Sequence, residues 1–206
     1  MSAGAPGRRV VVVRHGETDH NAGGVWQGQL DTPLSERGIE QARAAGAALA
    51  AYRPTRVVAS DLDRATVTAK HIAEAAGVEL SLDERWREIH VGQWQGMHTT
   101  QVRAEYAELL EQMDLEDIRR GVDGETLAEV GERAGAALRE LLDTLGDGEC
   151  VVVVAHGVSS RAAVAEVLGI DQHVATHALA TLGNCHWAEL AQTRTGWSLA
   201  AWNAHA

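Results

Sequence analysis

Two histidines, each followed by glycine, stand directly after short apolar runs in distant parts of the chain. His15 follows Val10–Val13 and Arg14, and His156 follows the run Cys150–Ala155. Because short β-branched runs are typical of strands buried on both faces, both histidines are expected at strand ends. A neutral imidazole held in line with a P–O bond can accept a phosphoryl group, which water later removes. The pattern therefore predicts phosphoryl-transfer chemistry, with His15 as the candidate nucleophile.

Such a reaction without a metal needs cations around the phosphoryl oxygens, and the chain offers three candidates. Arg14 is adjacent to the nucleophile, and its planar guanidinium can donate two hydrogen bonds to one phosphate. Arg64 is expected in the first turn of a helix capped by Asp61, where its side chain can reach the same edge of the sheet. His156, if protonated, would be a further charged donor. These residues form the expected phosphate clamp.

Glu88 is the candidate general acid. A carboxyl group beside a phosphate dianion and aromatic residues such as Trp86 and Trp94 tends to keep its proton. Each candidate also has an ordinary structural explanation, since Arg64 could form a surface ion pair and Glu88 could be solvated. The joint occurrence of these residue types is what favours an active site.

Amides and glycines are expected to complete the phosphate site. Asn21 and Gln27 follow the nucleophile on a loop that contains Gly28, and both amides can donate hydrogen bonds to phosphate oxygens. Gly16 and Gly157 would let the backbone approach the phosphate closely. A helix beginning at Gly157 would add the partial positive charge of its N-terminus.

Strand and helix patterns alternate along the chain, without repeats or an evident linker. Strands are expected at 10–13, 57–59, 78–82, 150–155, 182–190 and 197–202, and helices at 35–51, 62–76, 100–111, 126–145 and 159–168. The alternation predicts an α/β fold, a three-layer α/β/α sandwich with a mostly parallel central sheet. Residues 8–206 are expected to form a single domain after a flexible tail at 1–7, with a small helical cap insertion at about 90–125.

Composition argues against several classes of protein. A net charge of −11 opposes general nucleic-acid binding, and no apolar run approaches the length of a membrane span. A cytoplasmic protein with no nucleic-acid or membrane partner is expected, and Cys150 and Cys185 are expected to be buried and unpaired. His173 and His177 could share a helical face, but only Asp171 joins them at suitable spacing, so no metal site is expected.

The joint pattern resembles the histidine phosphatase superfamily, also called the phosphoglycerate-mutase-like family, over nearly the whole chain. The segments that carry the resemblance are Val13–Thr18 with Asn21, Gln27–Gly28 with Leu34–Gly38, Ser60–Ala65 with Thr68–Ala69, Arg87–Gly96, and Ala155–Gly157. Five separated matches in the right order make the resemblance specific.

The resemblance implies a role for each candidate residue. His15 is implied to be the phosphorylated nucleophile and Glu88 the proton donor. The implied phosphate contacts are the clamp of Arg14, Arg64 and His156, with auxiliary contacts from Asn21 and Gln27. No metal or organic cofactor is implied.

The segment Met97–Glu125 bears on the branch of the family. Mutases carry a longer insertion here, rich in basic groups, whereas this segment holds only Arg103, Arg119 and Arg120 among many acids. The chain therefore resembles the phosphatase branch, and short motifs near the nucleophile are similar to the glucosyl-phosphoglycerate phosphatase group. A metal-independent phosphatase acting on a small sugar- or glycerate-type phosphomonoester is expected.

Two alternatives stay open, a phosphoglycerate mutase and a non-catalytic phosphate-binding module. The presence of every clamp and acid candidate speaks against the second. His90 and His98 flank the tryptophan-containing loop and could either line the pocket or lie on the surface. Tryptophans are more often core or strand-pairing residues than substrate platforms, and Trp94 is the likeliest exception because Glu88 is nearby. A homodimer is left open.

Overall fold

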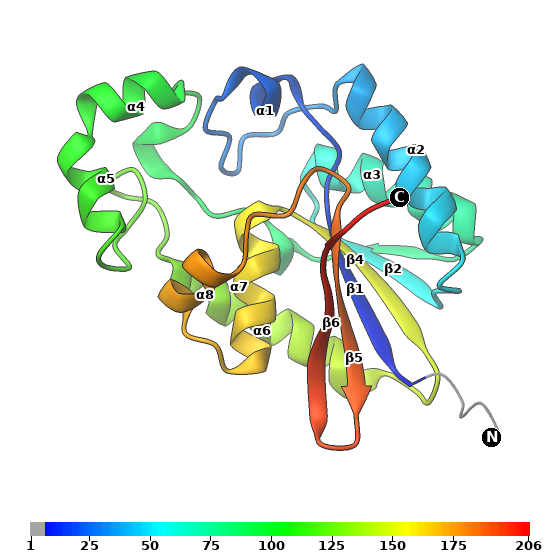
Figure 1. The fold of residues 1–206 in the computed structure, drawn as a ribbon. Helices are drawn as coiled ribbons and strands as arrows, with labels where there is room; N and C mark the ends of the chain where they lie inside the picture. The colour runs from blue at the N-terminus through cyan, green and yellow to red at the C-terminus, as the bar shows by residue number, and fades with distance from the viewer. Residues whose placement is uncertain (1–6) are drawn as a thin grey trace.

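The apolar runs of the sequence form one six-stranded sheet, shown by a computed structural model that describes residues 7–206 (Figure 1). The strands are β1 (Arg9–Arg14), β2 (Arg56–Ala59), β3 (Leu80–Leu82), β4 (Cys150–Ala155), β5 (Trp187–Thr193) and β6 (Gly196–Ala204). Their order is β3-β2-β4-β1-β5-β6. The first four strands are parallel, and β5 pairs antiparallel with both of its neighbours, β1 and β6. The expected tail at 1–7 lies outside the described residues, except for Gly7.

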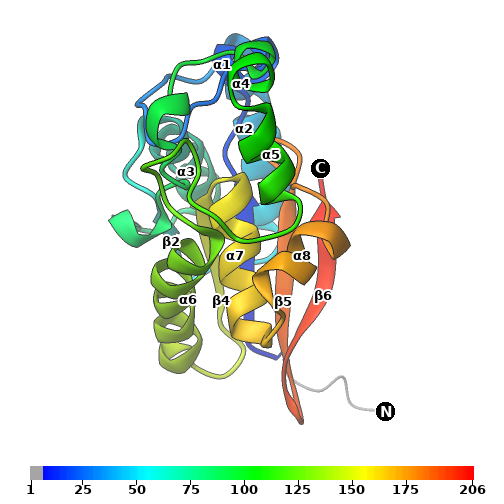
Figure 2. The same cartoon turned by 90° about the vertical axis from the view of Figure 1, so that its left-hand side faces the viewer.

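Helices cover both faces of this sheet and extend beyond its upper edge (Figures 1 and 2). They are α1 (Asp19–Gly23), α2 (Glu36–Ala50), α3 (Asp63–Ala76), α4 (Thr99–Glu105), α5 (Ala107–Met113), α6 (Leu127–Thr144), α7 (Gly157–Leu168) and α8 (Gln172–Ala178), with 3-10 turns η1 (Glu84–Trp86) and η2 (Gly92–Trp94). Val11 and Val13 of β1 pack towards α2 and α3, whereas Val10 and Val12 pack towards α6 and α7. The predicted three-layer α/β/α sandwich is confirmed.

Side-chain caps fix the starts of two long helices. Ser35 accepts a hydrogen bond from the Gly38 N–H at the start of α2, as its sequence position predicts. Thr126 and Glu129 form a reciprocal capping box at the start of α6.

The expected cap of α3 is wrong. Leu62, rather than Asp61, holds the N-cap position and makes no side-chain hydrogen bond. The Asp61 carboxylate instead accepts a hydrogen bond from Arg87 Nε at 2.8 Å. Asp61 therefore forms a long-range ion pair with Arg87 instead of capping the helix, which is the role that the local sequence suggests.

The strand expected at 182–190 begins later than predicted. Residues up to His186 are irregular, and Cys185 adopts a positive φ of 57°, outside the extended region of backbone space. Its N–H donates to the Arg14 carbonyl at 3.0 Å, which ties this segment to the end of β1. Both cysteines are buried and free, and burial raises the pKa of Cys185 to about 12.

The helices α4 and α5 project beyond the sheet on one side (Figure 1). The single helix expected at 100–111 is broken at Tyr106, which leaves the helical region of backbone space. Trp94 is fully buried here, with its ring 5.0 Å from Trp26 and 5.8 Å from Tyr106. Within residues 7–206, no helix is long and apolar enough to span a membrane.

Candidate active site

The register of the two central strands brings the two histidines together. β1 and β4 are parallel neighbours, with Arg14 opposite Ala155, so that His15 and His156 leave the sheet side by side. The His15 N–H donates to the Ala155 carbonyl at 3.0 Å, and the two imidazole centroids lie 5.1 Å apart. The prediction that both histidines lie at one edge of the sheet is confirmed.

One hydrogen bond fixes the tautomer of His15. Its Nδ1 lies 2.6 Å from the Gly16 carbonyl oxygen, which only accepts, so Nδ1 carries the proton and Nε2 keeps its lone pair. Burial lowers the pKa of His15 well below its ordinary value, and the charges of Arg64 and Arg14 lower it further. The ring is therefore neutral near pH 7 and can act as a nucleophile.

His156 does not meet the condition of protonation under which it would be a charged donor. It is completely buried, and burial together with the nearby charge of Arg64 holds its pKa well below the ordinary value. Its Nε2 lies 2.9 Å from the Ser60 hydroxyl oxygen. Its Nδ1 is buried without a hydrogen-bond partner among residues 7–206. The positive charge of the site therefore comes from the arginines.

Both arginines of the predicted clamp are held by backbone carbonyls. Arg14 donates to the Leu182 carbonyl at 2.7 Å, and Arg64 donates to those of Leu30 and Gly28 at 2.7 and 2.8 Å. Arg64 is only 1% exposed. In the described part of the chain, the buried Nε of each arginine has no hydrogen-bond partner. Buried unpaired N–H donors are costly, and an anion bound between them would satisfy both.

Glu88 lies at the start of α7. Its carboxylate accepts hydrogen bonds from the N–H groups of Val158 at 3.1 Å and Ser159 at 3.0 Å, and from Ile89 at 2.9 Å. The positive end of the helix dipole therefore holds the acid. Trp86 and Trp94 are buried in separate clusters of the core and do not line the pocket, contrary to the expected aromatic surroundings.

The glycines after the two histidines have different structural surroundings. A Cβ on Gly16 would lie 2.5 Å from the Gly38 carbonyl oxygen, so this glycine permits backbone packing rather than the expected approach to phosphate. A Cβ on Gly157 would lie 3.7 Å from both Arg14 Nε and Glu88 Oε2. Gly157 therefore sits between Arg14 and Glu88.

The predicted amides both line the pocket, but their oxygens are already engaged. Gln27 Oε1 accepts from the Thr32 hydroxyl at 2.6 Å, which leaves its NH₂ group as the available end. Asn21 Oδ1 accepts from the N–H of Thr18 at 3.2 Å and from Asn184 Nδ2 at 3.3 Å.

Asn184 also donates to the His15 carbonyl at 3.0 Å, so it supports the backbone of the candidate nucleophile. The sequence does not indicate this role for Asn184, because its segment carries a strand-like apolar pattern.

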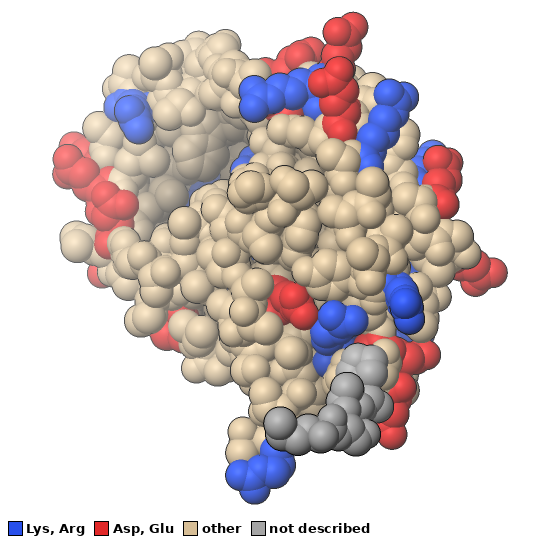
Figure 3. Space-filling model, turned by 45° about the vertical axis from the view of Figure 1, so that its right-hand side comes forward, with Lys and Arg blue, Asp and Glu red and all other residues tan. Residues whose placement is uncertain are grey.

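A pocket of about 260 Å³ opens over these groups. Figure 3 shows a hollow between the α4–α5 projection and the body of the molecule, with basic atoms visible at its floor. It is lined by Arg14, His15, His20, Asn21, Gly24, Val25, Trp26, Gln27, Gly28, Arg64, Glu88, Ile89, Val91, Thr99 and Val158. Glu88 is the only carboxylate among these described lining residues, so the pocket favours an anion at its basic floor.

The pocket-lining residues away from the histidines and arginines, here called the far wall, include His20, Val25, Trp26, Val91 and Thr99. This wall differs from expectation. Trp26 lines it in place of Trp94, which packs behind Trp26. His90 and His98 are not among the lining residues, and His20 is. His173 and His177 lie on α8 with ring centroids 4.7 Å apart, and no group of three potential metal ligands occurs within residues 7–206.

Comparison with known proteins agrees with this geometry. A family model described as the histidine phosphatase superfamily (branch 1) matches residues 10–205. A glucosyl-3-phosphoglycerate phosphatase of Mycolicibacterium vanbaalenii is 38% identical, covering 97% of this chain and 96% of the relative. A probable phosphoglycerate mutase of Serratia proteamaculans is 33% identical over 94% of this chain and 89% of the relative.

Solved structures give the same result. The mycobacterial glucosyl-3-phosphoglycerate phosphatase in complex with VO₃ superposes with a TM-score of 0.88 at 35% identity, covering 96% of this chain and 99% of that one. The extent of the family match and the shared fold lead to one assignment: the chain belongs to the histidine phosphatase superfamily, branch 1.

Proposed function

We propose that the chain is a metal-independent phosphatase that hydrolyses a small sugar- or glycerate-type phosphomonoester through a phosphohistidine on His15. One observation carries the proposal. His15 is neutral with its proton fixed on Nδ1, and it shares a pocket with two arginines whose buried Nε donors lack partners among the described residues. A free imidazole lone pair beside unpaired N–H donors is what an attacking nucleophile and a phosphoryl anion require.

In the first half of the proposed reaction, His15 Nε2 attacks phosphorus. The N–P bond forms as the bond from phosphorus to the leaving oxygen breaks, and the Glu88 carboxyl proton passes to that oxygen. Arg14 and Arg64 neutralise charge on the equatorial oxygens, and His156 contributes a neutral imidazole donor.

In the second half, the Glu88 carboxylate takes a proton from water as the water oxygen attacks phosphorus. The N–P bond breaks, inorganic phosphate leaves, and His15 returns to its neutral Nδ1-protonated form. The NH₂ groups of Asn21 and Gln27 are proposed as auxiliary donors to the phosphate.

Metal independence is proposed from the donor set. The pocket floor presents N–H donors and guanidinium charge, which suit an anion and repel a divalent cation. Turnover should therefore be unchanged by a chelator such as EDTA, and a loss that added Mg²⁺ or Zn²⁺ restores would contradict this part of the proposal.

The positions of the basic residues after Met97 support hydrolysis over mutase activity. Arg119 pairs with Glu129 and Arg120 with Asp117, so neither guanidinium is free to hold a second anionic group of a substrate. Arg103 is exposed and does not line the pocket.

The far wall supports a substrate with a sugar-like body. Trp26 offers an indole beside the apolar Val25 and Val91, while His20 and Thr99 supply polar groups. Such a mixture suits a ring with apolar faces and hydroxyl edges. The names of the phosphatase relatives point to the same substrate class.

The test is an assay of free phosphate released from hexose phosphates, a glucosylated phosphoglycerate and the phosphoglycerate isomers. A phosphatase releases phosphate in proportion to substrate consumed. Interconversion of the isomers with constant free phosphate would identify a mutase instead, and binding without turnover would identify a phosphate-binding module.

A further inference from the structure

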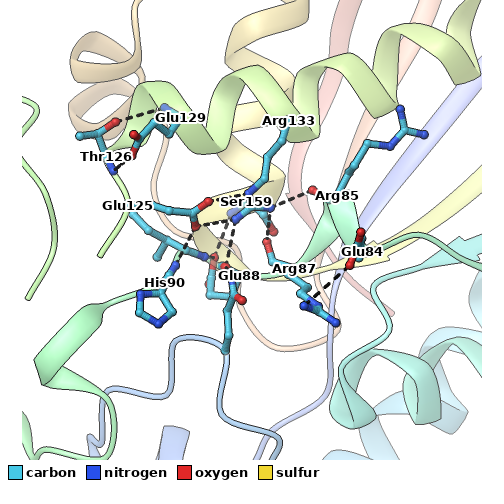
Figure 4. A network of polar contacts seen from close by, with 12 residues as sticks. Glu84, Arg85, Arg87, Glu88, His90, Glu125, Thr126, Glu129, Arg133 and Ser159 are labelled. Atoms are coloured by element: carbon cyan, nitrogen blue, oxygen red, sulfur yellow. Dashed lines mark hydrogen bonds and ion pairs between the residues drawn. The ribbon is translucent and has the colours of Figure 1, made fainter. Parts of the chain in front are cut away.

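Arg133 reaches from α6 to the segment that carries Glu88, and all of its donors are used (Figure 4). Its Nη1 donates to the carbonyls of Arg85 at 2.8 Å and Arg87 at 2.7 Å, and its Nη2 donates to that of Glu88 at 3.1 Å. Nε and Nη2 also donate to Glu125, each at 2.8 Å. A guanidinium has five N–H donors, and these five hydrogen bonds match that number.

Glu125 holds the guanidinium from the other side and is itself hydrogen-bonded to the segment that carries Glu88. Its Oε2 accepts from the His90 N–H at 2.8 Å, and its own N–H donates to the His90 carbonyl at 2.8 Å. Burial raises the pKa of Glu125, but hydrogen bonds from Arg133 and the His90 N–H outweigh it and hold the pKa below its ordinary value. The ion pair thus links α6 to the backbone on both sides of Ile89.

The backbone around Glu88 has no regular structure that could position the acid. Residues 87–91 belong to no helix or strand. The Glu88 side chain is held at the start of α7, and its carbonyl accepts from Arg133 and from Gln29 Nε2 at 3.0 Å. Backbone N–H groups at the start of α7 therefore hold its carboxylate, and side chains from distant elements hold its carbonyl.

We propose that Arg133, oriented by Glu125, is a positioning residue that sets where Glu88 meets the leaving oxygen of the substrate. The proposal rests on the proposed function, in which Glu88 is the proton donor. Proton transfer requires hydrogen-bond distance to the leaving oxygen, and displacement by about 1 Å can cost about 100-fold in rate. Arg133 does not line the pocket, so the proposed effect on the leaving oxygen passes through the position of Glu88.

The experiment uses the dependence of turnover on the leaving group. An alkyl phosphate such as glycerol phosphate needs its leaving oxygen protonated, whereas p-nitrophenyl phosphate needs little protonation. Arg133→Met keeps the aliphatic stem and removes all five donors. Arg133→Lys keeps the positive charge beside Glu125 but lacks the planar set of five N–H donors. It replaces the methionine variant in the test if that variant does not fold. Arg139→Met is the matched control, because Arg139 lies on the same helix in an exposed pair with Glu166.

Arg133→Met should lower kcat on the alkyl phosphate about 10- to 100-fold and change kcat on nitrophenyl phosphate about twofold or less. Arg133→Lys should show the same selectivity with a smaller loss, and Arg139→Met should match the unmodified protein. Combining Arg133→Met with Glu88→Gln should add little to the alkyl-phosphate loss of Glu88→Gln alone, because both act on one proton transfer.

Two results overturn the proposal in distinguishable ways. In the first, Glu88→Gln lowers kcat selectively on the alkyl phosphate, but the Arg133 variants lower kcat equally on both substrates or not at all. Arg133 then has no positioning role. If Glu88→Gln itself loses equally on both substrates, the proton-donor role of Glu88 fails, and the positioning role fails with it.

Discussion

The two ends of the pocket are built in different ways. The phosphate end stands on the central strands, where the β1–β4 register fixes His15 beside His156 and backbone carbonyls hold both arginines. The far wall stands outside the sheet, where Trp26 packs against Trp94 and Trp94 packs in turn against Tyr106. Sheet geometry leaves little freedom at the first end, whereas loop packing can change at the second without disturbing the chemistry. Catalysis and specificity are therefore expected to respond to different mutations.

The largest effect should come from the nucleophile. His15→Ala should lower kcat by about 10⁴-fold or more on every substrate, because it removes the atom that carries the phosphoryl group. The free energy of unfolding should change little in comparison, which urea titration would check. Substantial turnover in this variant would mean that the phosphate end works without His15.

The next effect concerns the clamp. Arg64→Met should lower kcat/KM by about 10²- to 10³-fold on all substrates alike, since its charge acts on the phosphoryl group that they share. Arg43→Met, at an exposed position of α2, is the control. A loss confined to large substrates would place Arg64 with the far wall and break the comparison.

The phosphate end should also impose a pH dependence on stability. His15 and His156 have pKa values held below their ordinary value, so the unfolded chain binds more protons than the folded one below about pH 6.5. The free energy of unfolding should fall as pH drops from 7 towards 5, by up to about 1.4 kcal/mol per pH unit for each histidine.

Urea unfolding at pH 7, 6 and 5 measures this slope, and it should be smaller in His15→Ala. An unchanged slope in that variant would show that His15 is not the buried neutral group described.

The smallest effect is expected at the far wall. Trp26→Leu should raise KM for a hexose phosphate about tenfold, by loss of aromatic contact area, and leave acetyl phosphate almost unchanged. Comparable losses on both substrates would show that the wall is coupled to the phosphate end after all.

The same contrast explains what the sequence could predict. The histidines and Arg64 follow strands of a parallel sheet, and the carboxyl ends of such strands meet at one edge. Local sequence patterns therefore predict that these residues lie close together. The Arg87 ion pair of Asp61, the Asn184 contact with His15 and the five hydrogen bonds of Arg133 join residues far apart in sequence. Neither periodicity nor propensity carries information on such pairs.

Trp94 is a further case in which contacts between distant residues overrule what the local sequence suggests. A tryptophan near the acid is a reasonable substrate platform from sequence, yet the break of the helix at Tyr106 lets Trp94 pack inside the projection. Trp26, which has no motif of its own, takes the pocket-facing position.

The most direct test of the account is to identify the phosphorylated residue. The protein is mixed with a ³²P-labelled phosphomonoester, quenched in alkali within the first turnover, digested and analysed by mass spectrometry. The proposed phosphohistidine reaction predicts an acid-labile, alkali-stable phosphoryl group on His15 that disappears in His15→Ala. Label on another residue, or turnover with no labelled protein at any quench time, would contradict it.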